Sequence, residues 1–89
     1  MKAILTIIGM DRVGIVYKCS KLLYEANINI LDITQTLMED KFVAMFNIDL
    51  SDMKVTFDEL VESFDKLAEE IGVDIRIQNE KLFDKMHRI

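Results

Sequence analysis

The sequence of 89 residues contains one cysteine, one histidine, three glycines, and neither proline nor tryptophan. A single cysteine cannot form an intrachain disulfide, which fits a reducing compartment. One cysteine and one histidine are also too few for a structural zinc site, since such a site takes four ligands of these kinds. We therefore expect the chain to hold no metal and no cofactor.

Long hydrophobic runs and clustered positive charge are also missing. No run approaches the roughly 18 apolar residues of a membrane span, and the N-terminus lacks the pattern of a signal peptide. Lysine and arginine number 11 against 16 acidic residues, for a formal net charge of −5. Nucleic-acid binding relies on clustered cations that neutralise phosphates. We therefore expect a cytoplasmic protein without a membrane or nucleic-acid partner.

The abundant residue types indicate a folded domain. Hydrophobic residues make up 51% of the chain and charged residues 30%, which is the composition of a compact domain rather than a disordered chain. A domain of this size has a small core, so that association with a second copy would help to bury apolar surface.

Hydrophobic periodicity predicts six elements in the order βαββαβ. Strands are expected over residues 2–8, 28–38, 42–50 and 73–78, and helices over 14–26 and 57–71. Asn27 and Gly72 are suited to end the two helices in the left-handed conformation, and Thr56 with Glu59 forms a capping-box pattern that starts the second helix. This order predicts an α+β, ferredoxin-like domain, with a four-stranded antiparallel sheet and both helices on one face.

The second face of that sheet is left without helices. Its expected residues are Ile4, Ile8, Thr34, Val43 and Met45. Residues 1–79 form the predicted domain, and residues 80–89 a short C-terminal helical tail whose apolar stripe must dock on something. The tail and a second copy of the chain are both candidates to cover the open face.

The stretch "GMDRVGIVYKC", residues 9–19, joins the first strand to the first helix. Its two glycines have the spacing of the first half of a phosphate-binding loop, but Ile15 and Val16 stand where Lys and Ser or Thr are required. Three glycines in the whole chain also exclude the dinucleotide-binding fingerprint. The nucleophile candidate Cys19 lies in the apolar stripe of the helix, and His87, the only histidine, lies in the tail. We therefore expect no enzymatic activity.

The turn can nevertheless hold a small ligand. The free N–H groups of a helix that starts near Gly14 suit a carboxylate, and Asp11 can receive an ammonium group. The two charges together would match a zwitterion. The alternative is that Asp11 is an N-cap or turn residue and Arg12 is solvated.

Two segments, "IGMDRVGIV" and "LYEANINILDITQT", resemble the ACT domain, a small regulatory module of amino-acid metabolism. The resemblance covers residues 2–79 and is especially close to short bacterial proteins that consist of one ACT domain, some of which resemble regulators of glycine cleavage. It implies a ferredoxin-like fold and the binding of amino acids or other small molecules between paired domains.

The resemblance also implies the site residues. The residues that match the loop near the ligand are Asp11, Arg12, Gly14 and Ile15, and the polar–apolar pair that opens the second strand is Asn29 and Ile30. Val13 replaces the proline of many members, and Asn27 their glycine.

The leading hypothesis is a non-enzymatic regulatory homodimer that binds a small-molecule effector of the amino-acid class and signals to a partner protein. The alternative is a ligand-free module for protein interaction or dimerisation. A third option, an acylphosphatase-like enzyme, is disfavoured because that family's loop with its catalytic arginine is not seen.

Overall fold

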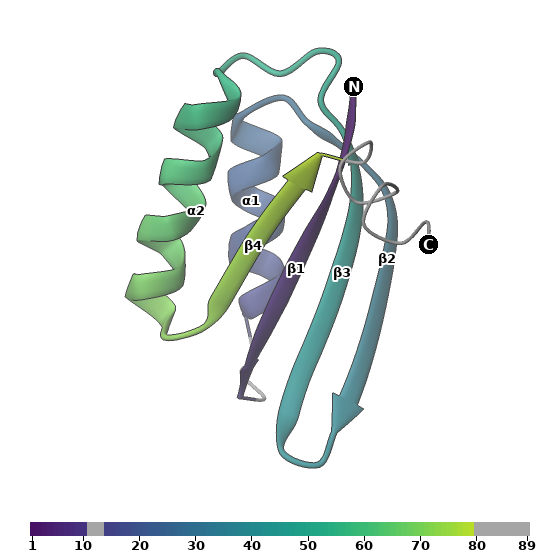
Figure 1. Cartoon of the computed structure of the whole chain (residues 1–89), viewed down its shortest axis with the longest axis vertical. Helices are drawn as coiled ribbons and strands as arrows, with labels where there is room; N and C mark the ends of the chain where they lie inside the picture. The colour runs from purple at the N-terminus through teal and green to yellow at the C-terminus, as the bar shows by residue number, and fades with distance from the viewer. Residues whose placement is uncertain (11–13, 80–89) are drawn as a thin grey trace, which may run out of the picture.

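The computed structural model describes residues 1–10 and 14–79. The described elements follow the predicted order, and their bounds are β1 Lys2–Met10, α1 Ile15–Glu25, β2 Asn29–Met38, β3 Lys41–Asp49, α2 Phe57–Ile71 and β4 Asp74–Asn79. Both helices lie on one face of a four-stranded sheet (Figure 1). The predicted ferredoxin-like fold is therefore confirmed.

The sheet has the strand order β2-β3-β1-β4, and each neighbouring pair is antiparallel. The central strand β1 continues to Met10, past the predicted end at Ile8. It continues because Gly9 pairs with Phe42 and Met10 with Lys41 on β3. The first glycine of the turn motif is thus part of the sheet.

The core lies between the sheet and the helices. Alternate residues of β1 and β3 are fully buried, as are the apolar stripes of both helices; the largest of these side chains are Phe46, Phe64, Leu5, Ile7, Ile15, Leu23, Ile48 and Leu60. Among the described residues, no polar or charged side chain is buried. Cys19 is in this core, as expected, and burial raises the pKa of its thiol to about 11.

Both helices end as the sequence predicts. Asn27 has φ of 61° and Gly72 has φ of 70°, both in the left-handed region. At the start of α2, the backbone N–H of Glu59 donates to Thr56 Oγ1 (3.1 Å), and the backbone N–H of Thr56 donates to Glu59 Oε1 (3.0 Å). This reciprocal pair is the predicted capping box.

The capping box should make stability depend on pH. The hydrogen bonds from Thr56 hold the pKa of Glu59 below its ordinary value, so that ionised Glu59 stabilises the folded state above the unfolded pKa of about 4.3. We expect wild type to be more stable than Glu59→Gln above about pH 5, and the difference to vanish as the pH falls through the folded pKa. Glutamine keeps an acceptor for Thr56, so urea unfolding of the two proteins across acidic pH isolates the charge. A constant difference across that range would contradict this assignment.

Strand β2 departs from a simple alternation. The register with β3 shifts between Ile30 and Asp32, which leaves Leu31 as the extra residue of a bulge. The sequence pattern groups Leu31 with Ile33 and Leu37, but in the structure Ile33 and Leu37 share a phase with Ile30 instead. On β3, Ile48 pairs with Ile30, Phe46 with Ile33, and Phe42 with Leu37.

The open face of the sheet has the predicted residues. The register aligns Ile4, Ile8, Thr34, Val43 and Met45 on the side opposite to the core. The predicted tail, residues 80–89, lies outside the described residues, so its proposed docking on this face stays a prediction. Neither of the two described helices is long and apolar enough to cross a membrane.

Candidate functional site

The first helix begins at Gly14, which occupies the N-cap in a left-handed conformation with φ of 97°. Glycine has no side chain to cap the helix, and the first turn of α1 carries no acidic residue. A Cβ added at Gly14 would meet no described atom within 4 Å. The first N–H groups of α1 therefore lack a side-chain acceptor among the described residues, and no described atom fills the space beside Gly14.

The turn motif suggests that Gly9 leaves room for a ligand, but in the structure Gly9 leaves room for a neighbouring side chain. A Cβ at this position would lie 2.4 Å from Val73 Cγ1 and 3.0 Å from Val73 Cβ. The close approach that Gly9 allows is thus to Val73, the residue between α2 and β4, and the space is already filled. Gly14, in contrast, leaves room for a ligand.

The other predicted site residues fall into three groups. Asp11 and Arg12 lie outside the described residues. Ile15 is only 2% exposed and packs in the core, so it can offer a ligand its backbone but little side-chain surface. Asn29 is exposed and Ile30 half-buried, at the start of β2.

One chain does not bring Asn29 and Gly14 together. Asn29 pairs with Asp49, which pairs with Lys2 at the beginning of β1. The turn follows Met10 at the end of β1, eight residues further along, or about 26 Å at 3.3 Å per residue. Figure 1 shows the same separation, with α1 starting at the lower end of the sheet and β2 at the upper end.

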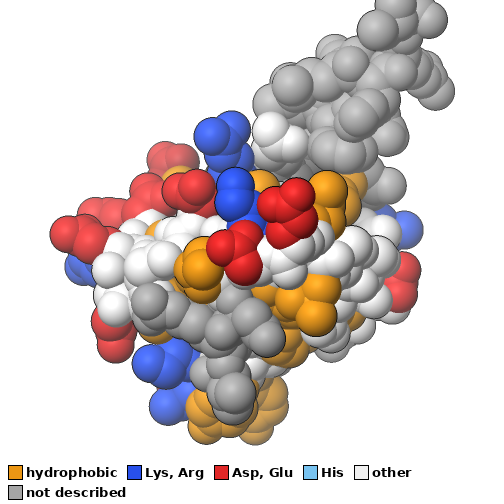
Figure 2. All heavy atoms as spheres, turned by 90° about the horizontal axis from the view of Figure 1, so that it is seen from below, with side chains coloured by type: hydrophobic (Ala, Val, Ile, Leu, Met, Phe, Trp, Pro, Cys, Tyr) orange, Lys and Arg blue, Asp and Glu red, His pale blue; other side chains and the backbone are white. Residues whose placement is uncertain are grey.

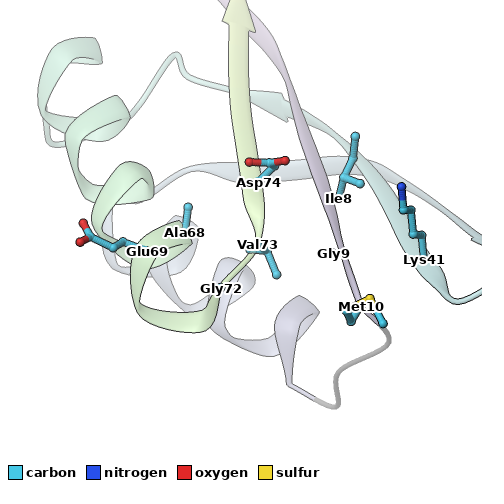
Figure 3. Close-up of a pocket in the computed structure, with 9 residues that line it drawn as sticks. All are labelled: Ile8, Gly9, Met10, Lys41, Ala68, Glu69, Gly72, Val73 and Asp74. Atoms are coloured by element: carbon cyan, nitrogen blue, oxygen red, sulfur yellow. The ribbon is translucent and has the colours of Figure 1, made fainter.

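The turn end of the sheet also contains a hollow of about 360 Å³ that the sequence motifs do not indicate. Its lining comes from the ends of β1, β3, β4 and α2 (Figure 3): Ile8, Gly9, Met10, Lys41, Ala68, Glu69, Gly72, Val73 and Asp74. Figure 2, which views the molecule from this end, shows acidic and basic side chains beside hydrophobic ones. Three separate segments of the chain, residues 8–10, 41 and 68–74, form the hollow, so no local pattern could have identified it.

The remaining polar groups do not form a cluster suited to a metal ion in the described part of the chain. Within residues 1–10 and 14–79, no three His, Cys, Asp or Glu residues are grouped so as to hold a metal ion. Asp49, at the far end of β3, accepts hydrogen bonds from Ser51 Oγ (2.6 Å) and Ser51 N–H (3.0 Å), which lower its pKa. This carboxylate therefore stabilises a turn.

Comparison with known proteins agrees with the fold. Residues 2–78 match the family model of the ACT domain. A UPF0237 protein of Clostridium acetobutylicum is 45% identical over 89 residues, covering all of both chains. An ACT domain protein from Streptococcus pneumoniae has a structure with a TM-score of 0.82 and 37% identity, covering 93% of each chain.

A candidate glycine cleavage system transcriptional repressor shares the fold, with a TM-score of 0.77 and 15% identity over 86% of this chain and 45% of its own. The element order and the four-stranded antiparallel sheet agree with this structural likeness. The chain therefore belongs to the ACT domain family, whose members are regulatory domains that bind small molecules.

Proposed function

We propose that this protein is a non-enzymatic regulator that binds an effector of the amino-acid class as a homodimer. The observation that carries the proposal is the start of α1, where Gly14 leaves the helix N-terminus uncapped by any described side chain and open to a carboxylate. Membership of the ACT domain family supplies the ligand class. The response is passed to a partner protein, because the family's role is regulatory.

The separation of the two halves of the site favours two copies. Gly14 and Asn29 lie at opposite ends of one protomer. If β2 pairs with β2 of a second copy about a two-fold axis, the strands run antiparallel and their ends exchange. Asn29 of the second copy would then lie toward the Met38 end of β2, which is the end of the sheet where the turn is found. The ligand would be held between Gly14 of one copy and Asn29 and Ile30 of the other.

The exposure of β2 supports this arrangement. It is an edge strand of ten residues, and all of them except Ile30 are exposed. Leu37 is 63% and Ile33 is 37% exposed, although both share the phase of residues that face the core. A long edge strand with apolar side chains and unpaired backbone groups is a template for pairing with another chain.

Effector binding would act on the dimer through linkage. A ligand that contacts both copies binds the paired state more tightly than the separate chains, and it stabilises that state by its difference in affinity. Coupling energies of this kind are typically about 1–3 kcal/mol. The effector would therefore change the fraction of the protein that is dimeric and available to a partner.

The direct test is a thermal-shift screen against the twenty amino acids, followed by calorimetry. We expect one or a few of them to raise the unfolding midpoint at millimolar concentration. Gly14→Leu should abolish the response because its side chain fills the open space, whereas Gly14→Ala imposes the same left-handed strain with far less bulk and should retain part of it. If no amino acid shifts the midpoint, the protein is better described as a ligand-free dimerisation module.

The dimer surface can be tested separately. Leu37→Lys places a charge on the exposed face of β2 and should weaken dimerisation about tenfold or more, with little effect on the fold of each chain. Ser63→Lys makes the same change in charge on the exposed surface of α2 and should leave the dimer intact. Sedimentation across a concentration series would measure both. Equal dimerisation of Leu37→Lys and wild type would refute pairing through β2.

A further inference from the structure

The hollow at the turn end of the sheet is separate from the start of α1. Its lining residues belong to β1, β3, β4 and the end of α2, and none belongs to α1 or β2. One protomer therefore forms it completely, and the site does not depend on the dimer or on the proposed effector function.

The hollow has an apolar floor between two opposite charges. Asp74 pairs with Ile8 across β4 and β1, and Lys41 pairs with Met10 across β3 and β1. Their side chains, with that of Ile8 between them, project from the same face of three adjacent strands (Figure 3). Within the described part of the chain, neither Asp74 nor Lys41 has a side-chain hydrogen bond or an ion pair.

The strand geometry sets the distance between the Cα atoms of these two residues. Two strand spacings of about 4.8 Å and an offset of two residues along the strands place the Cα atoms of Asp74 and Lys41 about 12 Å apart. Both side chains stand roughly perpendicular to the sheet in the structure (Figure 3), and in this arrangement the charged groups are separated by a similar distance. Two hydrogen bonds of about 2.9 Å would leave about 6 Å to be spanned by a ligand.

The surroundings decide which end of the ligand binds where. The last turn of α2 carries Glu69 and no basic residue, and the carbonyl end of a helix is partly negative. Asp74 therefore lies in a negative environment that favours a cation, and Lys41, on the other side of Ile8, favours an anion. Ile8 and Met10, which share the phase of these two residues, can contact an apolar chain between them.

We propose that this hollow binds a linear zwitterion whose ammonium and carboxylate groups lie about 6 Å apart. The ammonium group is held by Asp74, the carboxylate by Lys41, and the connecting chain packs on Ile8 and Met10. An ω-amino acid of four or five carbons and a dipeptide both have this spacing, whereas an α-amino acid places its two charges closer together than this.

The experiment titrates the full-length protein with 5-aminopentanoate, glycylglycine and L-leucine, with amide NMR and calorimetry as readouts. We expect saturable binding of 5-aminopentanoate or of glycylglycine, depending on which connecting chain packs better on Ile8 and Met10. The amide chemical-shift changes should be centred on Gly9 and Val73. Asp74→Asn and Lys41→Gln should each weaken that binding about tenfold or more, as expected for the loss of a charge-assisted hydrogen bond.

The matched controls are Asp65→Asn and Lys66→Gln, which make the same charge changes at exposed positions of α2. They should bind like wild type, and so should the Leu37→Lys variant, because the hollow lies within one protomer. The proposal is overturned if neither long zwitterion binds, if L-leucine binds at the hollow equally well, or if the Asp74 and Lys41 variants bind as well as the wild type. None of these outcomes affects the effector site at Gly14, which the amino-acid screen tests through Gly14→Leu.

Discussion

Phe46→Ala is expected to lower the free energy of unfolding by about 3–5 kcal/mol, the usual cost of removing a fully buried aromatic side chain. Phe46 is 0% exposed, at the centre of β3, and pairs with Leu5 on β1 and Ile33 on β2. A domain of this length has roughly 4–13 kcal/mol of total stability. The variant should therefore lose a large share of that stability, which urea denaturation followed by circular dichroism would measure.

The neighbouring residue provides the control. Met45 is next to Phe46 in sequence but points to the open face, where it is 36% exposed. Met45→Ala should cost less than about 1 kcal/mol in the separate chain, since surface substitutions usually have small effects. Similar losses for the two variants would mean that the open face is covered as fully as the core.

Gly9→Ala is expected to destabilise the fold by about 1–3 kcal/mol, because the new methyl group has no room. Its Cβ would lie 2.4 Å from Val73 Cγ1, and valine is restricted in its side-chain rotamers, so it cannot readily turn away. The strain would push β1 away from the start of β4, beside the hollow. The free energy of unfolding, measured by urea titration, should fall accordingly.

A double-mutant cycle gives this prediction a sharper form. Gly9→Ala combined with Val73→Ala should cost less than the sum of the single changes, because removal of Cγ1 relieves the closest contact while Val73 Cβ, at 3.0 Å, still requires a small shift. Gly14→Ala is the matched control. A Cβ at Gly14 would meet no described atom within 4 Å, Val73 included, so Val73→Ala should give it no rescue. Additive effects at Gly9 and Val73 would show that the glycine is not required by this contact.

The fold could be predicted from the sequence because its signals are local. The apolar stripe of α2, its capping box at Thr56 and its end at Gly72 are all written in consecutive residues, and each appears in the structure as predicted. The bulge at Leu31 could not be predicted. It exists because the pairing with β3 slips by one residue, and pairing register is a property of two strands together.

The site was less predictable for the same reason. The glycine pattern of residues 9–14 indicates a turn open to a ligand, but only the packing shows that Gly9 is filled by Val73 while Gly14 is open. The resemblance implies that Asn29 and Gly14 belong to one site, but only the sheet register shows that one chain places them at opposite ends of β1.

The sequence by itself determined the element order, the helix ends, the core stripes and the family, because periodicity, capping and turn chemistry act within a few residues of one another. Tertiary structure alone decided that the edge strand β2 is exposed, that Val73 fills the space at Gly9 whereas no described atom fills it at Gly14, and that Asp74 and Lys41 flank Ile8. These features depend on which strands become neighbours and in what register, and residues 33 positions apart in the chain then share one surface.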